Sequence, residues 1–199
     1  MLVITGTLFF FHHRGHGGHG VLLIKQKKLY VLCALCGEFP YLCSVMEKFE
    51  LHILGCGSAL PTTRHFATSQ VVNVRDKLYM IDCGEGSQLQ FRKSRLKFSR
   101  LNHIFISHLH GDHCFGLLGL ISTLNLLGRT AELHIHSPKG LEALFVPMLS
   151  FFCRQMTYQV LFHEFETKEP GMIYEDRSLT VTTLSLIHIS EPTRLALIS

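Results

Sequence analysis

The amino-acid sequence predicts an α/β fold, with sheets packed in layers and helices covering them. The chain has 199 residues, of which 47% are hydrophobic and 17% are charged, a balance that argues against disorder. Strand-like runs with alternating apolar residues recur from Phe49 onward, and helical segments are set between them. No apolar run reaches the roughly 18 residues that a membrane helix needs, so we expect no membrane contact.

The first segment, residues 1–45, does not share this pattern. Histidines alternate with glycines there, and no strand or helix period is sustained. We expect an extension outside the domain, translated from upstream of a start at Met46. A zinc knuckle at Cys33 and Cys36 is the alternative, but it lacks two further ligands at a regular spacing.

The domain is expected to span residues 46–184. The tail, residues 185–199, resembles a translated sequencing adapter from Leu186 onward and is expected to be foreign to the fold. Seven cysteines at irregular spacing suit a reducing compartment. The apolar start of the chain also lacks the basic segment and the cleavage site of a signal peptide. We therefore expect a cytoplasmic protein.

Sheet elements come first within residues 46–184. Phe49, Leu51 and Ile53 alternate with polar residues, as in a strand with one buried face. Arg75 and Asp76 separate two short runs and predict a hairpin. The expected strands are residues 49–53, 69–74, 77–82, 102–107, 132–136, 158–165 and 178–183.

Three helices are expected between these strands, at residues 87–96, 115–127 and 141–151. The second helix is apolar on nearly every side and is closed by Gly128, so it must be buried. Pro147 predicts an interruption in the third helix.

The charge is unevenly distributed along the chain. The formal net charge of +4 comes mostly from the ends, because residues 46–184 hold 14 Lys and Arg against 13 Asp and Glu. Within this range, a run that we call the basic cluster consists of Arg92, Lys93, Arg95, Lys97 and Arg100. Such a run is common on a solvated helix face, and it also suits a contact with phosphate. The sequence leaves both interpretations open.

The most informative segment is an H-x-H-x-D-H pattern that follows the strand expected at residues 102–107. Its four candidate metal ligands are His108, His110, Asp112 and His113. If the backbone stays extended past Ser107, the first two histidines point to the same side. Gly111 then permits a sharp turn that returns the carboxylate and the last histidine toward the same point. Surface histidines at a strand end are the alternative interpretation.

Four ligands within this segment exceed what one tetrahedral zinc ion with an open water position needs. The surplus predicts two ions, with His108 and His110 on the first, and Asp112 and His113 on the second. Two such ions, about 3.5 to 4 Å apart, activate a shared water and bind the attacking and leaving oxygens of a phosphoester.

The other histidines and the glycine-rich turn receive no role. His134 and His136 form a His-x-His pair without a nearby carboxylate, which is typical of strand histidines that face solvent or a polar contact. Four further histidines are isolated: His52, His65, His103 and His163. Gly55 and Gly57 indicate a tight turn after a strand rather than a phosphate loop.

Three motifs occur in order along the chain. They are Leu54-Gly55-Cys56-Gly57-Ser58-Ala59-Leu60-Pro61-Thr62 followed by Arg64, then Ile81-Asp82-Cys83-Gly84-Glu85-Gly86-Ser87-Gln88, then Ser107-His108-Leu109-His110-Gly111-Asp112-His113. Together they resemble the ribonuclease Z family of the metallo-β-lactamase superfamily, over residues 46–184. The resemblance implies a four-layer αββα sandwich, truncated here to roughly its first half.

This resemblance also implies a function, a zinc-dependent endoribonuclease that hydrolyses a phosphodiester at the 3′ end of precursor tRNA. It implies two Zn²⁺ ions, and a homodimer in the intact protein. Asp112 would act as proton acceptor as well as ligand, and Asp82 would support the ligands from behind. The residues that would contact the RNA backbone are Arg64, Arg92, Lys93, Arg95 and Lys97.

The chain departs from the family pattern beyond residue 184. His188 stands where the family has a third histidine, but the residues after it do not continue as the family's do, and no Asp or His follows. The family's bridging aspartate and last histidine are missing, so we expect this chain to be inactive on its own. Two alternatives stay open, a non-catalytic metal-binding fragment and a different hydrolase of the same fold.

Overall fold

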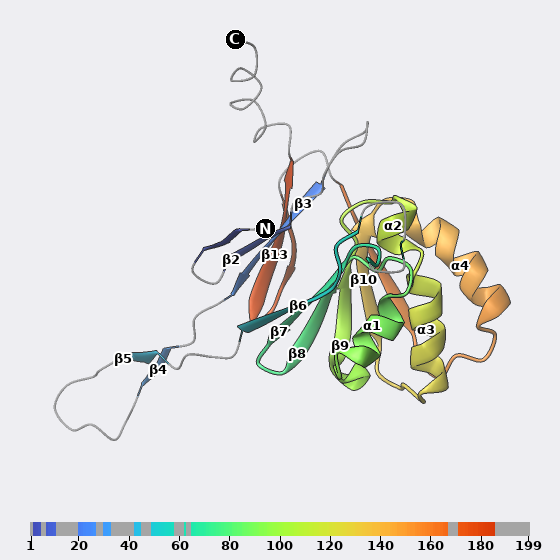
Figure 1. Cartoon of the computed structure of the whole chain (residues 1–199), viewed down its shortest axis with the longest axis horizontal. Helices are drawn as coiled ribbons and strands as arrows, with labels where there is room; N and C mark the ends of the chain where they lie inside the picture. Colours follow the sequence, from blue (N-terminus) through green and yellow to red (C-terminus); the bar gives the residue numbers. More distant parts are fainter. Residues whose placement is uncertain are drawn as a thin grey trace, which may run out of the picture.

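The computed structural model describes residues 2–4, 7–10, 20–26, 30–32, 42–44, 49–57, 62, 65–166 and 171–185 (Figure 1). The strands are β1 (Leu2–Ile4), β2 (Thr7–Phe10), β3 (Gly20–Gln26), β4 (Tyr30–Leu32), β5 (Leu42–Ser44), β6 (Phe49–Gly55), β7 (Ser69–Val74), β8 (Lys77–Ile81), β9 (Leu101–Phe105), β10 (Leu133–Pro138), β11 (Val160–Phe165), β12 (Gly171–Glu175) and β13 (Leu179–Ser185). The helices are α1 (Ser87–Lys93), α2 (Gly111–Cys114), α3 (Leu117–Leu126) and α4 (Leu141–Phe152), with a 3₁₀ turn at Phe98–Arg100.

The main sheet has six strands in the order β11-β10-β9-β8-β7-β6. β6, β7 and β8 are antiparallel neighbours, and the Arg75–Asp76 turn makes the expected hairpin with both residues at positive φ. From β8 to β11 the neighbouring strands are parallel. Parallel strands require crossover connections, which are supplied here by the helices. The carboxyl ends of these four strands therefore meet at one edge.

The two faces of the main sheet have different covers. Helices α1, α3 and α4 cover one face, and their buried side chains, such as Phe91, Leu120 and Phe145, pack on it (Figure 1). The second sheet, in the order β1-β2-β3-β13-β12, covers part of the other face. Val181 of that sheet shares a buried cluster with Tyr79 of the main sheet. The described residues thus form three successive layers, helix, sheet and sheet.

The second sheet includes a strand from the expected N-terminal extension. β3 pairs along its whole length with β13, and the side chain of Ile24 is fully buried in the cluster between the sheets. The domain boundary at residue 46 stays a prediction. Cys33 and Cys36, the alternative zinc knuckle, lie outside the described residues.

Two helix predictions need correction. α4 runs without interruption through Pro147. The buried residues of this helix, Leu141, Phe145 and Leu149, form a stripe that does not include the proline. Pro147 lies on the exposed side, where the carbonyl group that loses its hydrogen bond can meet water. The helix expected at residues 115–127 is α3, which covers Leu117–Leu126 and is preceded by the separate one-turn helix α2. It is not buried to its end, since Leu126 is 83% exposed.

The sequence analysis expected none of the strands β1 to β5, and within residues 46–184 it missed one strand, β12. β12 pairs with β13 through a register shift between Met172 and Tyr174, so its residues do not alternate regularly between the two faces. Without that alternation the sequence carries no strand period. In the described ranges, no helix is long and apolar enough to cross a bilayer.

Candidate metal centre

The H-x-H-x-D-H segment leaves the carboxyl end of β9, at the edge where the parallel strands end (Figure 1). The backbone at His110 is extended, with φ −78° and ψ 147°, and α2 begins at the next residue. The expected extension and turn are therefore present. A Cβ atom at Gly111 would meet the ring of Phe115 in its present position, and this ring is 73% exposed. In open α/β sheets, ligands bind at this edge.

The four candidate ligands lie next to one another. The ring centroid of His108 is 3.8 Å from that of His113 and 4.7 Å from that of His110. Oδ2 of Asp112 lies 3.5 Å from Nε2 of His113. The Nε2 atoms of His108 and His113 are both buried, whereas His110 is exposed. The segment thus gathers three imidazoles and one carboxylate in one place.

This gathering is not a finished coordination sphere. Within the described ranges, three or more His, Cys, Asp or Glu side chains nowhere adopt an arrangement that could hold a metal ion. The donor types nevertheless fit zinc, which proteins bind through imidazole nitrogen and carboxylate oxygen. Assigning His108, His110, Asp112 and His113 as ligands stays a prediction.

Asp82 lies directly behind these side chains, with 4% exposure. It follows β8 in the left-handed region at φ 56°, which Asp adopts more readily than most residues. Its carboxylate accepts hydrogen bonds from Nδ1 of His113 at 2.7 Å, and from the backbone N–H of Ser107 at 2.8 Å and its hydroxyl at 2.9 Å. A buried carboxylate needs such partners. This geometry supports the expected role of Asp82, because it fixes the ring of His113.

The loop after Asp82 is bound to α2 through the backbone. The N–H of Cys83 donates to the carbonyl oxygen of His113 at 2.7 Å, and the N–H of Gly116 donates to that of Cys83 at 2.9 Å. A Cβ atom at Gly84 would collide with the carbonyl oxygen of Asp112, so glycine is what lets the two loops approach. The Asp-Cys-Gly motif therefore positions the candidate ligands as well as supporting them.

Two thiols lie close to these loops. Burial raises the pKa of the Cys83 thiol to about 12 and that of the Cys114 thiol to about 11. Both groups therefore keep their protons near neutral pH.

Most of the basic cluster is solvated. Its exposed members are Arg92, Lys93, Arg95 and Lys97. Arg100 differs, because its guanidinium donates to Oδ1 of Asp76 at 2.8 Å. Arg92 and Lys93 end α1, and the chain then runs through Arg95 and Lys97 to the 3₁₀ turn that leads into the start of β9, at the end of the parallel strands opposite to the site. Two other predicted site residues, Arg64 and His188, lie outside the described residues.

A second group of histidines was missed by the sequence analysis. We call it the sheet-face stack, and its members are His103, His134, His136 and His163. Nδ1 of His103 lies 3.3 Å from Nε2 of His136, and Nδ1 of His134 lies 3.0 Å from Nε2 of His163. Strand register aligns them, since His134 is opposite His103 and His136 is opposite His163. The His-x-His pair on β10 was the available signal.

Burial controls the protonation of this stack. It lowers the pKa of His103 to about 4 and that of His136 to about 3, with neighbouring histidines adding to the effect. It also lowers the pKa of His134. These imidazoles are therefore neutral at pH 7, and they satisfy one another by hydrogen bonding. The predicted polar contact of His134 and His136 is confirmed, and the contact is to other histidines.

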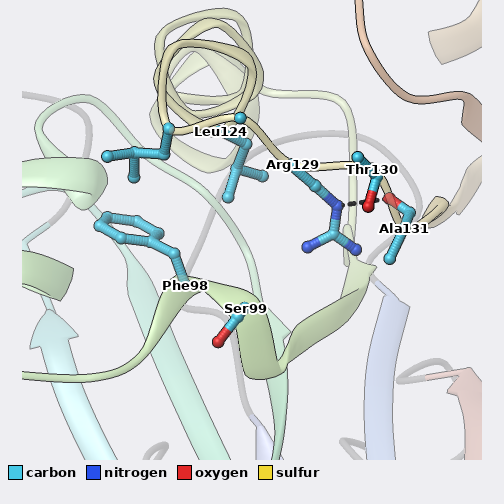
Figure 2. A pocket seen from close by; sticks show the side chains of 8 residues that line it. Phe98, Ser99, Leu124, Arg129, Thr130 and Ala131 are labelled. Carbon is cyan, nitrogen blue, oxygen red and sulfur yellow. Dashed lines mark hydrogen bonds between the residues drawn. The ribbon is translucent and has the colours of Figure 1, made fainter.

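A small hollow lies at the opposite end of the parallel strands, between the end of α3 and the start of β9 (Figure 2). Its volume of about 230 Å³ is below that of most ligand pockets. Arg129 lines it, and its guanidinium donates to the carbonyl oxygens of Leu101, Ala131 and Glu132 and to the side chain of Asn102. These bonds tie the starts of β9 and β10 together, so Arg129 has a structural role.

The layered sheets, together with the histidine-rich loop at the carboxyl edge of β9, fit the expected metallo-β-lactamase-like fold class. Among solved structures, the short form of human tRNase Z (ELAC1) is similar with a TM-score of 0.59 and 26% identity. The similarity covers 68% of this chain and 64% of that chain. The expected fold class is confirmed.

A family model described as Anti-Pycsar protein Apyc1 matches residues 49–198, and the chain belongs to this family. Curated relatives named ribonuclease Z confirm the expected resemblance. The one from Bacteroides thetaiotaomicron is 81% identical over 143 residues, which is 72% of this chain and 45% of the relative. The one from Porphyromonas gingivalis (strain ATCC 33277) is 59% identical over 143 residues, 72% of this chain and 47% of the relative.

The chain therefore spans about half the length of the curated relatives it matches. The family match also extends into residues 185–199, so the boundary at residue 184 stays a prediction.

Proposed function

We propose that this chain carries the histidine-rich half of the active site of a zinc-dependent endoribonuclease, which hydrolyses a phosphodiester at the 3′ end of precursor tRNA. The observation that carries the proposal is the imidazole group at the carboxyl edge of β9, held by Asp82, in a chain 81% identical over 143 residues to a ribonuclease Z. The family model is named after a different protein, and the high identity favours the ribonuclease.

Zinc is the metal that the donor set suits best. In the proposal, His108 and His110 hold one ion, and Asp112 and His113 hold the second. Zinc supplies Lewis acidity, which lowers the pKa of a bound water to about 7. We assign Asp112 a second task, acceptance of the proton of the attacking water, and its position in the first turn of α2 beside His113 supports this assignment.

The exposed residues of the basic cluster are proposed to bind the RNA backbone. Arg92 and Lys93 end α1, where basic side chains also stabilise the helix, so part of their presence has a structural cause. Their exposure, together with that of Arg95 and Lys97, leaves the charges available to phosphate. Arg64 completes the proposed contact. Arg100 is left out, because Asp76 already neutralises it.

The remaining properties follow from the same family. We assign a homodimer and a cytoplasmic location to the intact enzyme, with His188 as a further metal ligand. The segment of this chain alone is proposed not to cleave RNA. Its own residues supply one pair of ligands to each ion, and catalysis by two ions needs both held in a fixed relation.

A chimera tests this function directly. Residues 46–184 replace the matching segment of the Bacteroides thetaiotaomicron ribonuclease Z, and cleavage of a precursor tRNA is measured. We expect activity close to that of the parent enzyme, and a loss of at least about 100-fold with Asp112→Ala, because a ligand and a proton acceptor are removed together. Asp76→Ala is the matched control, since this carboxylate is 64% exposed and lies on a hairpin turn.

The alternatives give different results. A different hydrolase of the same fold would turn over bis(p-nitrophenyl) phosphate in the chimera but leave precursor tRNA intact. For the chain of residues 1–199, we expect fewer than two zinc ions bound per chain and no tRNA cleavage. Robust cleavage by that chain, lost on Asp112→Ala, would overturn the proposal that it is inactive alone.

A further inference from the structure

The hydroxyl of Ser107 makes four side-chain contacts that connect His108 and His113 to one carboxylate, and the longest of them is 3.4 Å, to Nδ1 of His113. The hydroxyl oxygen lies 2.9 Å and 3.0 Å from the two oxygens of Asp82. The same oxygen lies 3.1 Å from Nδ1 of His108. Ser107 is 6% exposed, so protein groups rather than bulk water satisfy its hydroxyl.

The direction of each hydrogen bond follows from chemistry. An ionised carboxylate only accepts, so the single hydrogen of the Ser107 hydroxyl must go to Asp82. The hydroxyl oxygen can then only accept from Nδ1 of His108, which must carry its ring hydrogen there. Nδ1 of His113 lies 2.7 Å from the same carboxylate and must also carry a hydrogen.

We propose that Ser107 is a positioning residue that relays the charge of Asp82 to His108, so that one carboxylate fixes the same tautomer in two histidines. In that tautomer the lone pair of each ring is on Nε2. Both Nε2 atoms are buried, and the two rings are 3.8 Å apart, so the lone pairs are presented within one small space. This inference rests on the proposed function, because presenting two lone pairs matters for holding a metal ion.

Ring tautomers can be read without any metal or RNA. Long-range ¹H–¹⁵N correlation spectra of the metal-free full chain, labelled with ¹⁵N-histidine at pH 8, distinguish hydrogen on Nδ1 from hydrogen on Nε2. His108→Gln and His113→Gln identify the two resonance sets by their loss. We expect hydrogen on Nδ1 in both rings of the unsubstituted chain, and hydrogen on Nε2 of His108 would overturn the proposal.

Substitutions of Ser107 distinguish the proposed relay through its hydroxyl from a role of its side chain in packing. Ser107→Ala should release the tautomer of His108 and leave that of His113 unchanged, because the direct bond from His113 to Asp82 remains. Ser107→Thr retains a hydroxyl and should restore the tautomer of His108. The matched control is Ser87→Ala, which removes another buried hydroxyl, one that donates to the carbonyl oxygen of Gly84 at 2.6 Å. An unchanged His108 in Ser107→Ala would contradict the relay.

Zinc affinity provides the second readout. Titration of the full chain with zinc should show about a 10- to 100-fold weaker affinity for Ser107→Ala, and affinity close to the original for Ser107→Thr and Ser87→Ala. A chain with the expected tautomers but no tRNA cleavage in the chimera would refute the proposed function and leave the relay intact. Cleavage by a chimera with the wrong tautomer would do the reverse.

Discussion

The two histidine groups of this protein are built from similar side chains and differ in what surrounds them. At the carboxyl edge of β9, the imidazoles of His108 and His113 are hydrogen-bonded to a buried carboxylate system, Asp82 with Ser107. In the sheet-face stack, imidazoles bond mainly to other imidazoles, and His103 also contacts the hydroxyl of Tyr174. The first environment favours a ring that offers a lone pair to a cation, and the second favours a neutral ring within the packing between strands.

The difference teaches that a histidine cluster is not itself a metal site. A carboxylate behind the ring fixes its tautomer and adds negative charge near the ligand, which increases metal affinity. Hydrogen bonds between imidazole rings add no negative charge and leave the tautomer without a carboxylate to fix it. In the sheet-face stack, burial lowers the pKa of His136 to about 3. The predictions below test this contrast in order of expected size.

Removal of the shared carboxylate should have the largest effect. Asp82→Ala is expected to lower the free energy of unfolding by about 3 kcal/mol, because it leaves the buried ring of His113 without its partner. Zinc affinity should also fall by about 100-fold. Urea denaturation and zinc titration measure the two effects. The control is Asp76→Asn, which removes a surface carboxylate but keeps a residue that tolerates the positive φ of the turn and an acceptor for Arg100, and it should change stability by less than about 0.5 kcal/mol. Equal losses for the two variants would remove the distinction between Asp82 and a surface carboxylate.

Acid should act mainly through the sheet-face stack. The pKa of His136 falls from 6.5 to about 3 on folding, so the unfolded chain binds more protons than the folded chain between these values. Stability is therefore fully present above pH 6.5 and is lost as the pH falls. His136 is 5% exposed in the folded chain. Its protonation in the unfolded chain should lower the free energy of unfolding by about 2 kcal/mol as the pH falls from 6.5 to 5.

Substitution isolates this acid response. His136 stacks on Phe105 with ring centroids 4.6 Å apart, so His136→Phe replaces it with a ring that does not titrate and fits the same stack. Denaturation at pH 7 and pH 5 should show a smaller loss of stability for this variant than for the original chain. An unchanged pH dependence would show that the stack does not control acid stability.

Local patterns in the sequence predicted much of this site. Six residues bring His108 and His113 close together, because an extended backbone is followed by a short helix, and the contacts of Asp82 and Cys83 with His113 then hold them in place. The Asp-Cys-Gly motif was recognised through the family resemblance, which implied the supporting role of Asp82. Ser107 was identified as part of a motif, but its role depends on meeting Asp82 across the β8–β9 pair, a contact between residues 25 positions apart.

The features that were missed depend on register between distant segments. The sheet-face stack forms only because β10 places His134 opposite His103 and His136 opposite His163. No pattern within β9 or β11 reveals that alignment, and each isolated histidine looks like an ordinary surface residue. β12 was hidden for a related reason, because its register shift against β13 removes the alternation that marks a strand.

The smallest predicted effect concerns the edge of the stack. Burial raises the pKa of Tyr174 to about 12, so its hydroxyl stays protonated, and this hydroxyl is hydrogen-bonded to Nε2 of His103 at 3.2 Å. Tyr174→Phe should lower the free energy of unfolding by about 1 kcal/mol, as expected for one lost hydrogen bond. Zinc affinity should stay unchanged, as measured by titration. A weaker zinc affinity in this variant would link the two histidine groups and contradict their separation.

Locating bound zinc tests the central claim most directly. Anomalous diffraction at the zinc edge, from crystals of the full chain grown with zinc, places the ion without any assumption about activity. We predict a peak about 2.0 to 2.2 Å from imidazole nitrogens of the H-x-H-x-D-H segment, with His108 and His113 coordinating through Nε2. Zinc bound only at the sheet-face stack, or not bound at the carboxyl edge of β9, would contradict the account.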